Sequence, residues 1–122
     1  MRIISFAWTT PALIALAKTC TRRDWDDDYA RTWHKGDFAQ SWDHLPRAHG
    51  RQVGVVELTN HPVKEWTNLI PSTDWEAEGF QYLTDYGCTL HGMTPQQVWD
   101  DWHTNPRKLW VIRFKLVSVK GN

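Results

Sequence analysis

Alternating apolar and polar positions mark several stretches of the chain as β-strands. The clearest is residues 51–59, in which valine and leucine supply most of the apolar side chains. Residues 109–119 show the same alternation with aromatic and β-branched side chains, and residues 2–6 and 37–42 are shorter stretches of this kind. The pattern therefore predicts at least four strands, with residues 60–71, which contain two prolines, as a connection.

Helix signals lie between these strands. The predicted helices cover residues 12–18, residues 26–34, a segment from Thr73 to about Tyr86, and a last segment that starts at Thr94–Pro95 and includes Trp102. Thr73 and Glu76 have the spacing of a capping box, in which each side chain bonds a backbone N–H at the helix start. Strands and helices are mixed without regular strand–helix–strand alternation, which favours the α+β class.

Composition narrows the class of protein. The 122 residues fit one domain, residues 1–122, and the 14 basic and 14 acidic side chains balance, so nucleic-acid binding driven by bulk charge is not expected. No apolar run approaches the ~20 residues that span a bilayer, and no signal-peptide pattern is present. Cys20 and Cys88 form no C-x-x-C pair, so the expected compartment is the reducing cytoplasm. The six histidines show no metal-binding spacing, so neither a metal nor a cofactor is expected.

Tryptophan is the unusual component of this composition. Nine tryptophans are far more than a chain of this length leads one to expect. Each buries a large apolar area but carries an N–H group that needs a partner. Most are therefore expected in the core, while others can line a pocket for a flat ring, because aromatic side chains stack on nucleic-acid bases.

The candidate chemistry begins in residues 18–23, Lys-Thr-Cys-Thr-Arg-Arg. Lys18 precedes Thr21 by three residues, and it could act as the base that activates this hydroxyl if burial lowers the lysine pKa. The simpler interpretation is that Lys18 complements the dipole at the C-terminus of the preceding helix, and that Thr21 starts a strand. The spacing alone does not decide between these interpretations.

Glu78 is the acid without an evident structural role in the helix that follows Thr73. Glu76 is assigned to the capping box, whereas Glu78 shares a helix face with Trp75 and Tyr82 at helical spacing. A carboxylate in an aromatic stripe is either a residue at the solvent edge or a functional group.

An ordered set of segments resembles the ASCH domain family. The segments are Ala17-Lys18-Thr19-Cys20-Thr21-Arg22-Arg23, Lys35-Gly36-Asp37, the strand end Leu58-Thr59, the acidic helix Asp74-Trp75-Glu76-Ala77-Glu78-Gly79-Phe80, and the last strand Trp110-Val111-Ile112-Arg113-Phe114. The resemblance covers most of the chain in the family's order. It implies a PUA-like small β-barrel of about five to six strands with helices packed around it, a fold associated with RNA binding.

The resemblance also implies an activity. Small members of the family are amidohydrolases that remove the acetyl group from N4-acetylcytidine, and their proposed triad is a lysine, a threonine and a glutamate. These roles fall on Lys18, Thr21 and Glu78. Arg23 matches a basic residue at the end of the first motif, and Arg22 is expected to be a surface or salt-bridging residue.

The mechanism that follows is an acyl transfer. Lys18 takes the proton of Thr21, the Thr21 oxygen attacks the acyl carbon of an N4-acylcytosine, and Glu78 orients the lysine and helps to protonate the leaving amine. Attack by a water that Thr21 and Glu78 position is the alternative at the same site. The candidate substrate contacts are Phe6, Trp8, Arg23 and Trp75, and the sequence does not choose which aromatic ring stacks on the pyrimidine.

Other functional classes stay open at this point. The substrate can be a free nucleoside, a base or a modified residue in RNA. A non-catalytic RNA-binding module, a metal-independent ribonuclease that uses the lysine and the glutamate, and a regulatory partner-binding domain are the alternatives. The acyl group and the oligomeric state cannot be read from the residues.

Overall fold

The computed structural model describes residues 1–121. Its strands are β1 (Arg2–Ser5), β2 (Cys20–Arg23), β3 (Phe38–Trp42), β4 (Gln52–Leu58), β5 (Val63–Trp66) and β6 (Lys108–Val119). Its α-helices are α1 (Thr10–Ile14), α2 (Asp27–Ala30), α3 (Asp74–Ala77), α4 (Phe80–Asp85) and α5 (Pro95–Thr104), and 3-10 turns cover Ala7–Thr9, Pro46–Ala48 and Thr67–Leu69.

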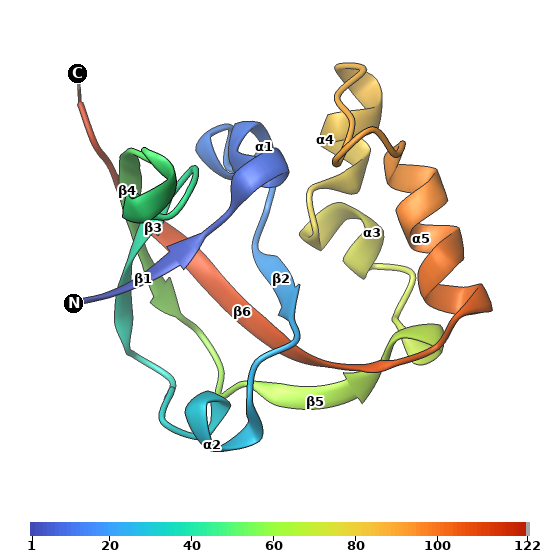
Figure 1. The fold of residues 1–122 in the computed structure, drawn as a ribbon, viewed down its shortest axis with the longest axis horizontal. Coiled ribbons are helices and arrows are strands. Elements are labelled where there is room, and N and C mark those ends of the chain that lie inside the picture. Colours follow the sequence, from blue (N-terminus) through green and yellow to red (C-terminus); the bar gives the residue numbers. More distant parts are fainter. Residues whose placement is uncertain (122) are drawn as a thin grey trace.

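The six strands form one curled sheet, a half-barrel, with strand order β1-β3-β4-β6-β2 and with β5 also paired to β6. β1 and β3 are parallel and the other pairs are antiparallel. The 12-residue strand β6 joins the two parts of the sheet, because its first half pairs with β2 and β5 and its second half pairs with β4. Figure 1 shows α3, α4 and α5 together on one side, beside β2 and the start of β6. The predicted α+β class, a small barrel with helices around it, is confirmed.

Two hydrophobic cores lie on opposite faces of β6, because successive side chains of a strand point to opposite sides. The core inside the curl contains Trp110, Ile112 and Phe114 from β6, together with residues of β1, β3 and β4. The helical core contains Leu109 and packs α3, α4 and α5 against the sheet. The site described below lies where these two cores meet, at strand β2.

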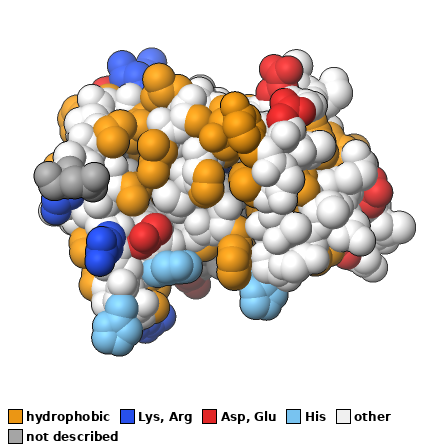
Figure 2. All heavy atoms as spheres, turned by 90° about the horizontal axis from the view of Figure 1, so that it is seen from above, with side chains coloured by type: hydrophobic (Ala, Val, Ile, Leu, Met, Phe, Trp, Pro, Cys, Tyr) orange, Lys and Arg blue, Asp and Glu red, His pale blue; other side chains and the backbone are white. Residues whose placement is uncertain are grey.

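Six of the nine tryptophans lie in or against the two cores, as expected. Trp33, Trp102 and Trp110 are buried, and Trp33 stacks on the half-buried Trp25 with ring centroids 5.4 Å apart. Trp8 and Trp66 are exposed. The face that carries α1 and α4 also exposes many apolar side chains, as Figure 2 shows.

The prediction of a single helix from Thr73 to about Tyr86 is wrong. The chain forms two short helices, α3 and α4, that are separated by Gly79, whose φ of 87° lies in the left-handed region. Thr73 makes no side-chain bond at the start of α3, so the predicted capping box is absent there. A capping box forms instead at the start of α5, where Thr94 and Gln97 exchange both bonds.

Two other predicted boundaries shift. Residues 60–71 contain strand β5, which the sequence pattern assigned to a connection. Helix α1 ends at Ile14, and Leu16 has a positive φ of 62°, so Lys18 lies beyond the helix and does not complement its dipole. Among residues 1–121, no helix combines the length and the apolar character needed to cross a membrane.

Candidate functional site

The segment that carries Lys18 is held between two helices. The backbone N–H of Ala17 donates to the Ala12 carbonyl of α1, and the N–H of Thr19 donates to the Ala77 carbonyl of α3, both at 2.8 Å. These bonds fix the chain on each side of Lys18 and direct its side chain inward. The Lys18 side chain is only 1% exposed, which is rare for a lysine.

The Lys18 amine has three acceptors around it. Its Nζ donates to the carbonyl oxygens of Cys20 at 2.7 Å and of Glu78 at 2.9 Å, and to the Glu78 Oε1 atom at 3.3 Å. Burial lowers the pKa of Lys18 below its usual range, although the Glu78 carboxylate acts in the opposite direction. A buried lysine with a lowered pKa is suited to accept a proton from a reacting group.

Glu78 reaches this position because α3 ends there. It is the residue that closes α3, directly before Gly79, and its side chain is 3% exposed. A Cβ atom at position 79 would lie 2.7 Å from the Ala12 Cβ and 3.3 Å from the Lys18 Cβ. Gly79 therefore allows both the turn between the helices and the close approach of Lys18 to Glu78.

A buried ion network continues from Glu78. Arg22 donates from one guanidinium nitrogen to Glu78 Oε2 at 2.6 Å and from the other to Asp74 Oδ2 at 2.7 Å. Arg113 on β6 binds the same Asp74 with two bonds, of 3.0 and 2.9 Å. Burial favours the neutral form of Arg22, but Glu78 and Asp74 outweigh it and raise the pKa of Arg22, so the guanidinium stays charged. The expectation that Arg22 forms a salt bridge is confirmed, and its side chain is buried.

Cys20 lies beside this network but is not a nucleophile. Its sulfur lies 3.6 Å from Glu78 Oε2 and 3.6 Å from a guanidinium nitrogen of Arg22. Burial and the Glu78 charge raise the pKa of the Cys20 thiol to about 12. The thiol therefore keeps its proton at neutral pH, and the thiolate that cysteine chemistry requires does not form.

Thr21 lies on β2 and is nearly buried, with 5% of its surface exposed. It lines a cavity of about 190 Å³ that also contains Lys18 and Glu78. The hydroxyl makes no hydrogen bond to either of them within the described part of the chain. The three residues that the resemblance assigns to catalysis therefore line one cavity, and the lysine among them already has three acceptors.

The rest of the cavity is mainly apolar, with four aromatic side chains. Its lining includes Phe6, Ala7, Trp8, Thr9, Arg22, Arg23, Phe80, Leu90, Val98 and Trp102. Trp8 is half exposed at the rim, with its ring 5.8 Å from the His91 ring. Three of the four predicted substrate contacts, Phe6, Trp8 and Arg23, therefore lie in this cavity.

Trp75 does not line the cavity. Its ring packs edge-on against Phe80 at 5.5 Å and against Trp99 at 5.5 Å, and its indole N–H donates to Gln81. The predicted helix face that joined Trp75 and Glu78 to Tyr82 does not exist, because Gly79 separates α3 from α4. Trp75 is a packing residue between α3, α4 and α5.

The guanidinium group of Arg23 makes one hydrogen bond across the half-barrel and has one N–H without a partner in residues 1–121. One of its guanidinium nitrogens donates to the Ser5 carbonyl on β1, which ties the two open edges of the half-barrel together. Its Nε atom is buried and has no hydrogen-bond partner in residues 1–121. A buried donor without a partner costs about 1–3 kcal/mol.

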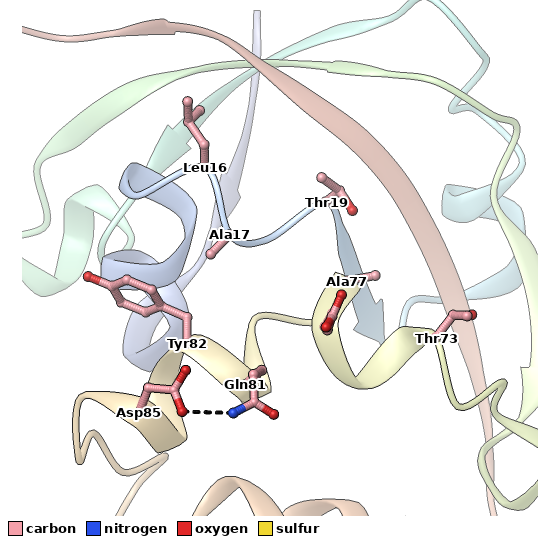
Figure 3. A pocket seen from close by; sticks show the side chains of 9 residues that line it. Leu16, Ala17, Thr19, Thr73, Ala77, Gln81, Tyr82 and Asp85 are labelled. Carbon is pink, nitrogen blue, oxygen red and sulfur yellow. Dashed lines mark hydrogen bonds between the residues drawn. The ribbon is translucent and has the colours of Figure 1, made fainter.

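A larger groove, of about 520 Å³, lies between the Leu16–Thr19 segment and helices α3 and α4 (Figure 3). It is lined by Thr73, Glu76, Ala77, Gln81, Tyr82 and Asp85 as well as Leu16, Ala17 and Thr19. Gln81 donates to Asp85 at 2.7 Å along helix α4, on one wall of this groove. The groove has hydroxyl and carboxylate side chains in its lining, but it is not lined by Lys18, Thr21 or Glu78.

Sequence reasoning missed much of the surrounding site. Asp74, Arg113, Phe80 and Trp102 complete either the ion network or the cavity wall, and no short motif links them to Lys18. The acidic segment at the start of α3 could have indicated these partners. A buried carboxylate needs a cation, which has to come from elsewhere in the chain. Across residues 1–121, no group of three or more His, Cys, Asp or Glu side chains is arranged to hold a metal ion.

The curled sheet with helices on one side places the protein in the class of small α+β half-barrels. No protein-family model matches the chain, and no curated protein matches it. Among solved structures, protein EF3133 from Enterococcus faecalis V583, described with the family model DUF984, has a similar fold. The TM-score is 0.59 at 12% identity, over 99% of this chain and 82% of that chain. At this identity the likeness shows a shared fold.

Proposed function

We propose that the protein is an amidohydrolase that cleaves the N4-acyl amide of an acylated cytosine or cytidine, such as N4-acetylcytidine. The observation that carries this proposal is that Lys18, Glu78 and Thr21 line one small cavity, although Glu78 is 60 residues from Lys18 in the chain. The resemblance of residues 17–23 and 74–80 to the ASCH amidohydrolases supplies the substrate class.

The reaction begins with proton transfer from the Thr21 hydroxyl to neutral Lys18. Of the three lysine contacts, the one to Glu78 Oε1 is the longest, at 3.3 Å, and it is the one that the lysine gives up to face Thr21. Catalytic hydrogen bonds often tighten only when the substrate is bound. The absence of a hydrogen bond between Thr21 and Lys18 in the free enzyme is therefore compatible with this role.

The Thr21 oxygen then forms a bond to the acyl carbon, and the carbonyl electron pair moves onto oxygen. When the tetrahedral intermediate collapses, the bond between carbon and N4 breaks, and the protonated Lys18 returns its proton to the leaving amine with Glu78 in support. A water molecule hydrolyses the acyl-threonine and releases the carboxylate. The Thr19 N–H is already bound to Ala77, and β2 is an edge strand that, within residues 1–121, pairs only with β6. The oxyanion would therefore be stabilised by those N–H groups of residues 20–23 that point away from β6.

The cavity fits a planar base better than a whole nucleoside. Its volume of about 190 Å³ lies below the range of roughly 300–1,000 Å³ that is usual for drug-sized ligands, so a ribose would remain at the rim. Phe6 and Trp102 offer ring surfaces inside, and Trp8 offers one at the mouth. The free Nε–H of Arg23 would bind the carbonyl oxygen of the pyrimidine.

The direct test is incubation of the purified protein with N4-acetylcytidine, followed by its change in absorbance and by identification of cytidine and acetate. Turnover with both products supports the proposal. Binding of RNA in a gel shift without any turnover would identify a binding module instead. Cleavage of RNA that persists in a chelator, again without loss of the acetyl group, would identify a ribonuclease.

The rate should depend on pH in a defined direction. Lys18 must be neutral to accept the Thr21 proton, so kcat/KM is expected to rise with pH as Lys18 loses its proton. Because burial lowers the Lys18 pKa, this rise should be complete at a lower pH than an ordinary lysine would allow. Measurement of kcat/KM for N4-acetylcytidine against pH tests this. A profile that falls from acid to neutral pH would exclude Lys18 as the base.

A further inference from the structure

Arg22 determines which cation pairs with the Glu78 carboxylate. Its guanidinium group lies between Glu78, at 2.6 Å, and Asp74, at 2.7 Å, and its side chain is 2% exposed. The contact from Arg22 to Glu78 is much shorter than the contact from Lys18 to the same carboxylate, at 3.3 Å. Glu78 is therefore paired mainly with Arg22.

The geometry points to Arg22 as a positioning residue of the proposed amidohydrolase: it holds the Glu78 carboxylate, so that the Lys18 amine is free to turn to Thr21. This inference rests on the proposed function for its chemical consequence. Its structural part concerns the pairing of three side chains and can be tested without any substrate.

The hydrogen bonds of Lys18 support this division of roles. Its two shorter bonds go to backbone carbonyl oxygens, which can still accept, more weakly, from the two N–H groups of a neutral amine. Only the longest bond, to Glu78 Oε1, depends on the positive charge of Lys18. If Arg22 were absent, Glu78 would keep Lys18 as its main cation, and the amine would stay protonated beside it.

The charge balance around the amine points the same way. The charged and titratable groups that face Lys18 directly or through the network are Cys20, Arg22 and Arg23 on β2, Asp74 and Glu78 on α3, Arg113 on β6 and Glu65 on β5. With Lys18 included, the cations in this set outnumber the carboxylates, since Cys20 remains a neutral thiol. Loss of the Lys18 proton removes this excess.

The arginine is itself held in place from the other side. Arg113 binds Asp74 through two bonds, and Asp74 in turn accepts from Arg22. The plane of the Arg22 guanidinium is therefore set by two carboxylates. A lysine at this position, with a single nitrogen, cannot bind both carboxylates with the same geometry.

The experiment compares the titration of the Lys18 amine in the wild type and in two variants, R22Q and R22K. The amine is observed by NMR in protein labelled with nitrogen-15 at lysine, and its signal is assigned by its loss in K18M. In R22Q the amine is expected to lose its proton at a higher pH than in the wild type. In R22K the pH at which the amine loses its proton should also rise, but by a smaller amount. If R22Q does not fold, the result for R22K decides the test.

The same variants are measured with N4-acetylcytidine. The rising part of the pH profile should move with the amine titration, and kcat at neutral pH should fall by roughly tenfold or more in R22Q, since one pH unit corresponds to a tenfold change in neutral amine. The control is Arg107→Gln, which breaks an exposed ion pair with Asp101 outside this network and should leave the Lys18 titration unchanged.

Two results would overturn the inference. One is a Lys18 titration that does not move in any Arg22 variant that folds. The other is a lower rate at every pH with an unchanged profile, which a purely structural arginine would produce. Failure of the proposed function looks different: the wild type would not cleave the amide, while the amine titration would still respond to the Arg22 variants.

Discussion

Replacement of Thr21 with alanine should abolish cleavage of N4-acetylcytidine while the protein remains folded. Loss of a nucleophile that acts together with a base costs roughly 10⁴- to 10⁶-fold in kcat in well-studied hydrolases, and Thr21 is the hydroxyl that shares the cavity with Lys18 and Glu78. Truncation removes one methyl and one hydroxyl at an edge strand, so the cost in stability should be small beside the loss of rate. The rate is measured by absorbance, and folding by circular dichroism.

Three further variants make this test specific. Thr21→Ser keeps a hydroxyl and should retain part of the rate, whereas Thr21→Val keeps the shape without the hydroxyl and should be inactive. The matched control is Thr19→Ala, because Thr19 lies two residues away and lines the separate groove of Figure 3. A Thr21→Ala protein that works at the normal rate would refute the nucleophile assignment. An acylated peptide containing Thr21, trapped during turnover, would exclude direct attack by water.

Gly79→Ala should be the most destabilising single-methyl change in the helical half of the protein. Gly79 has a φ of 87°, a conformation that costs an L-residue roughly 1–2 kcal/mol. The added Cβ would also lie 2.7 Å from the Ala12 Cβ, and overpacking of this kind costs about 1–3 kcal/mol more. The free energy of unfolding, measured in urea, should therefore fall by roughly 2–5 kcal/mol.

The control for this variant is Gly87→Ala. Gly87 also has a positive φ, of 67°, but nothing lies within 4 Å of the site of its Cβ, so only the backbone cost of roughly 1–2 kcal/mol applies. The difference between the two variants measures the close packing of Gly79 against Ala12 and Lys18. Equal stability losses would show that this packing contributes nothing.

The strands could be predicted where the alternation of side chains matches burial. β4 and β6 were found almost to the residue, because their inward-facing positions are apolar and fill the core of the half-barrel. β5 was missed because all four of its residues are exposed and its sequence does not alternate. Its strand conformation is set by pairing with β6, which local pattern does not show.

The site could be predicted only in part. Lys18, Thr21 and Glu78 were assigned through resemblance, and the helix-face reasoning offered for Glu78 was wrong because Gly79 interrupts the helix. The role of Arg22 depends on two acids more than 50 residues away, at separations of 52 and 56. Such a contact is determined by the packing of α3 against β2. It therefore cannot be predicted from residue spacing in the sequence.

The buried ion network also restricts how this sequence can diverge over generations. Loss of one partner from a buried pair costs about 3–5 kcal/mol, a large share of a typical stability of roughly 5–15 kcal/mol, whereas joint replacement by apolar residues can be nearly neutral. Arg22, Asp74, Glu78 and Arg113 are thus linked positions that lie in three separate segments of the chain. Substitution at one of these positions should therefore be accompanied by substitution at the others.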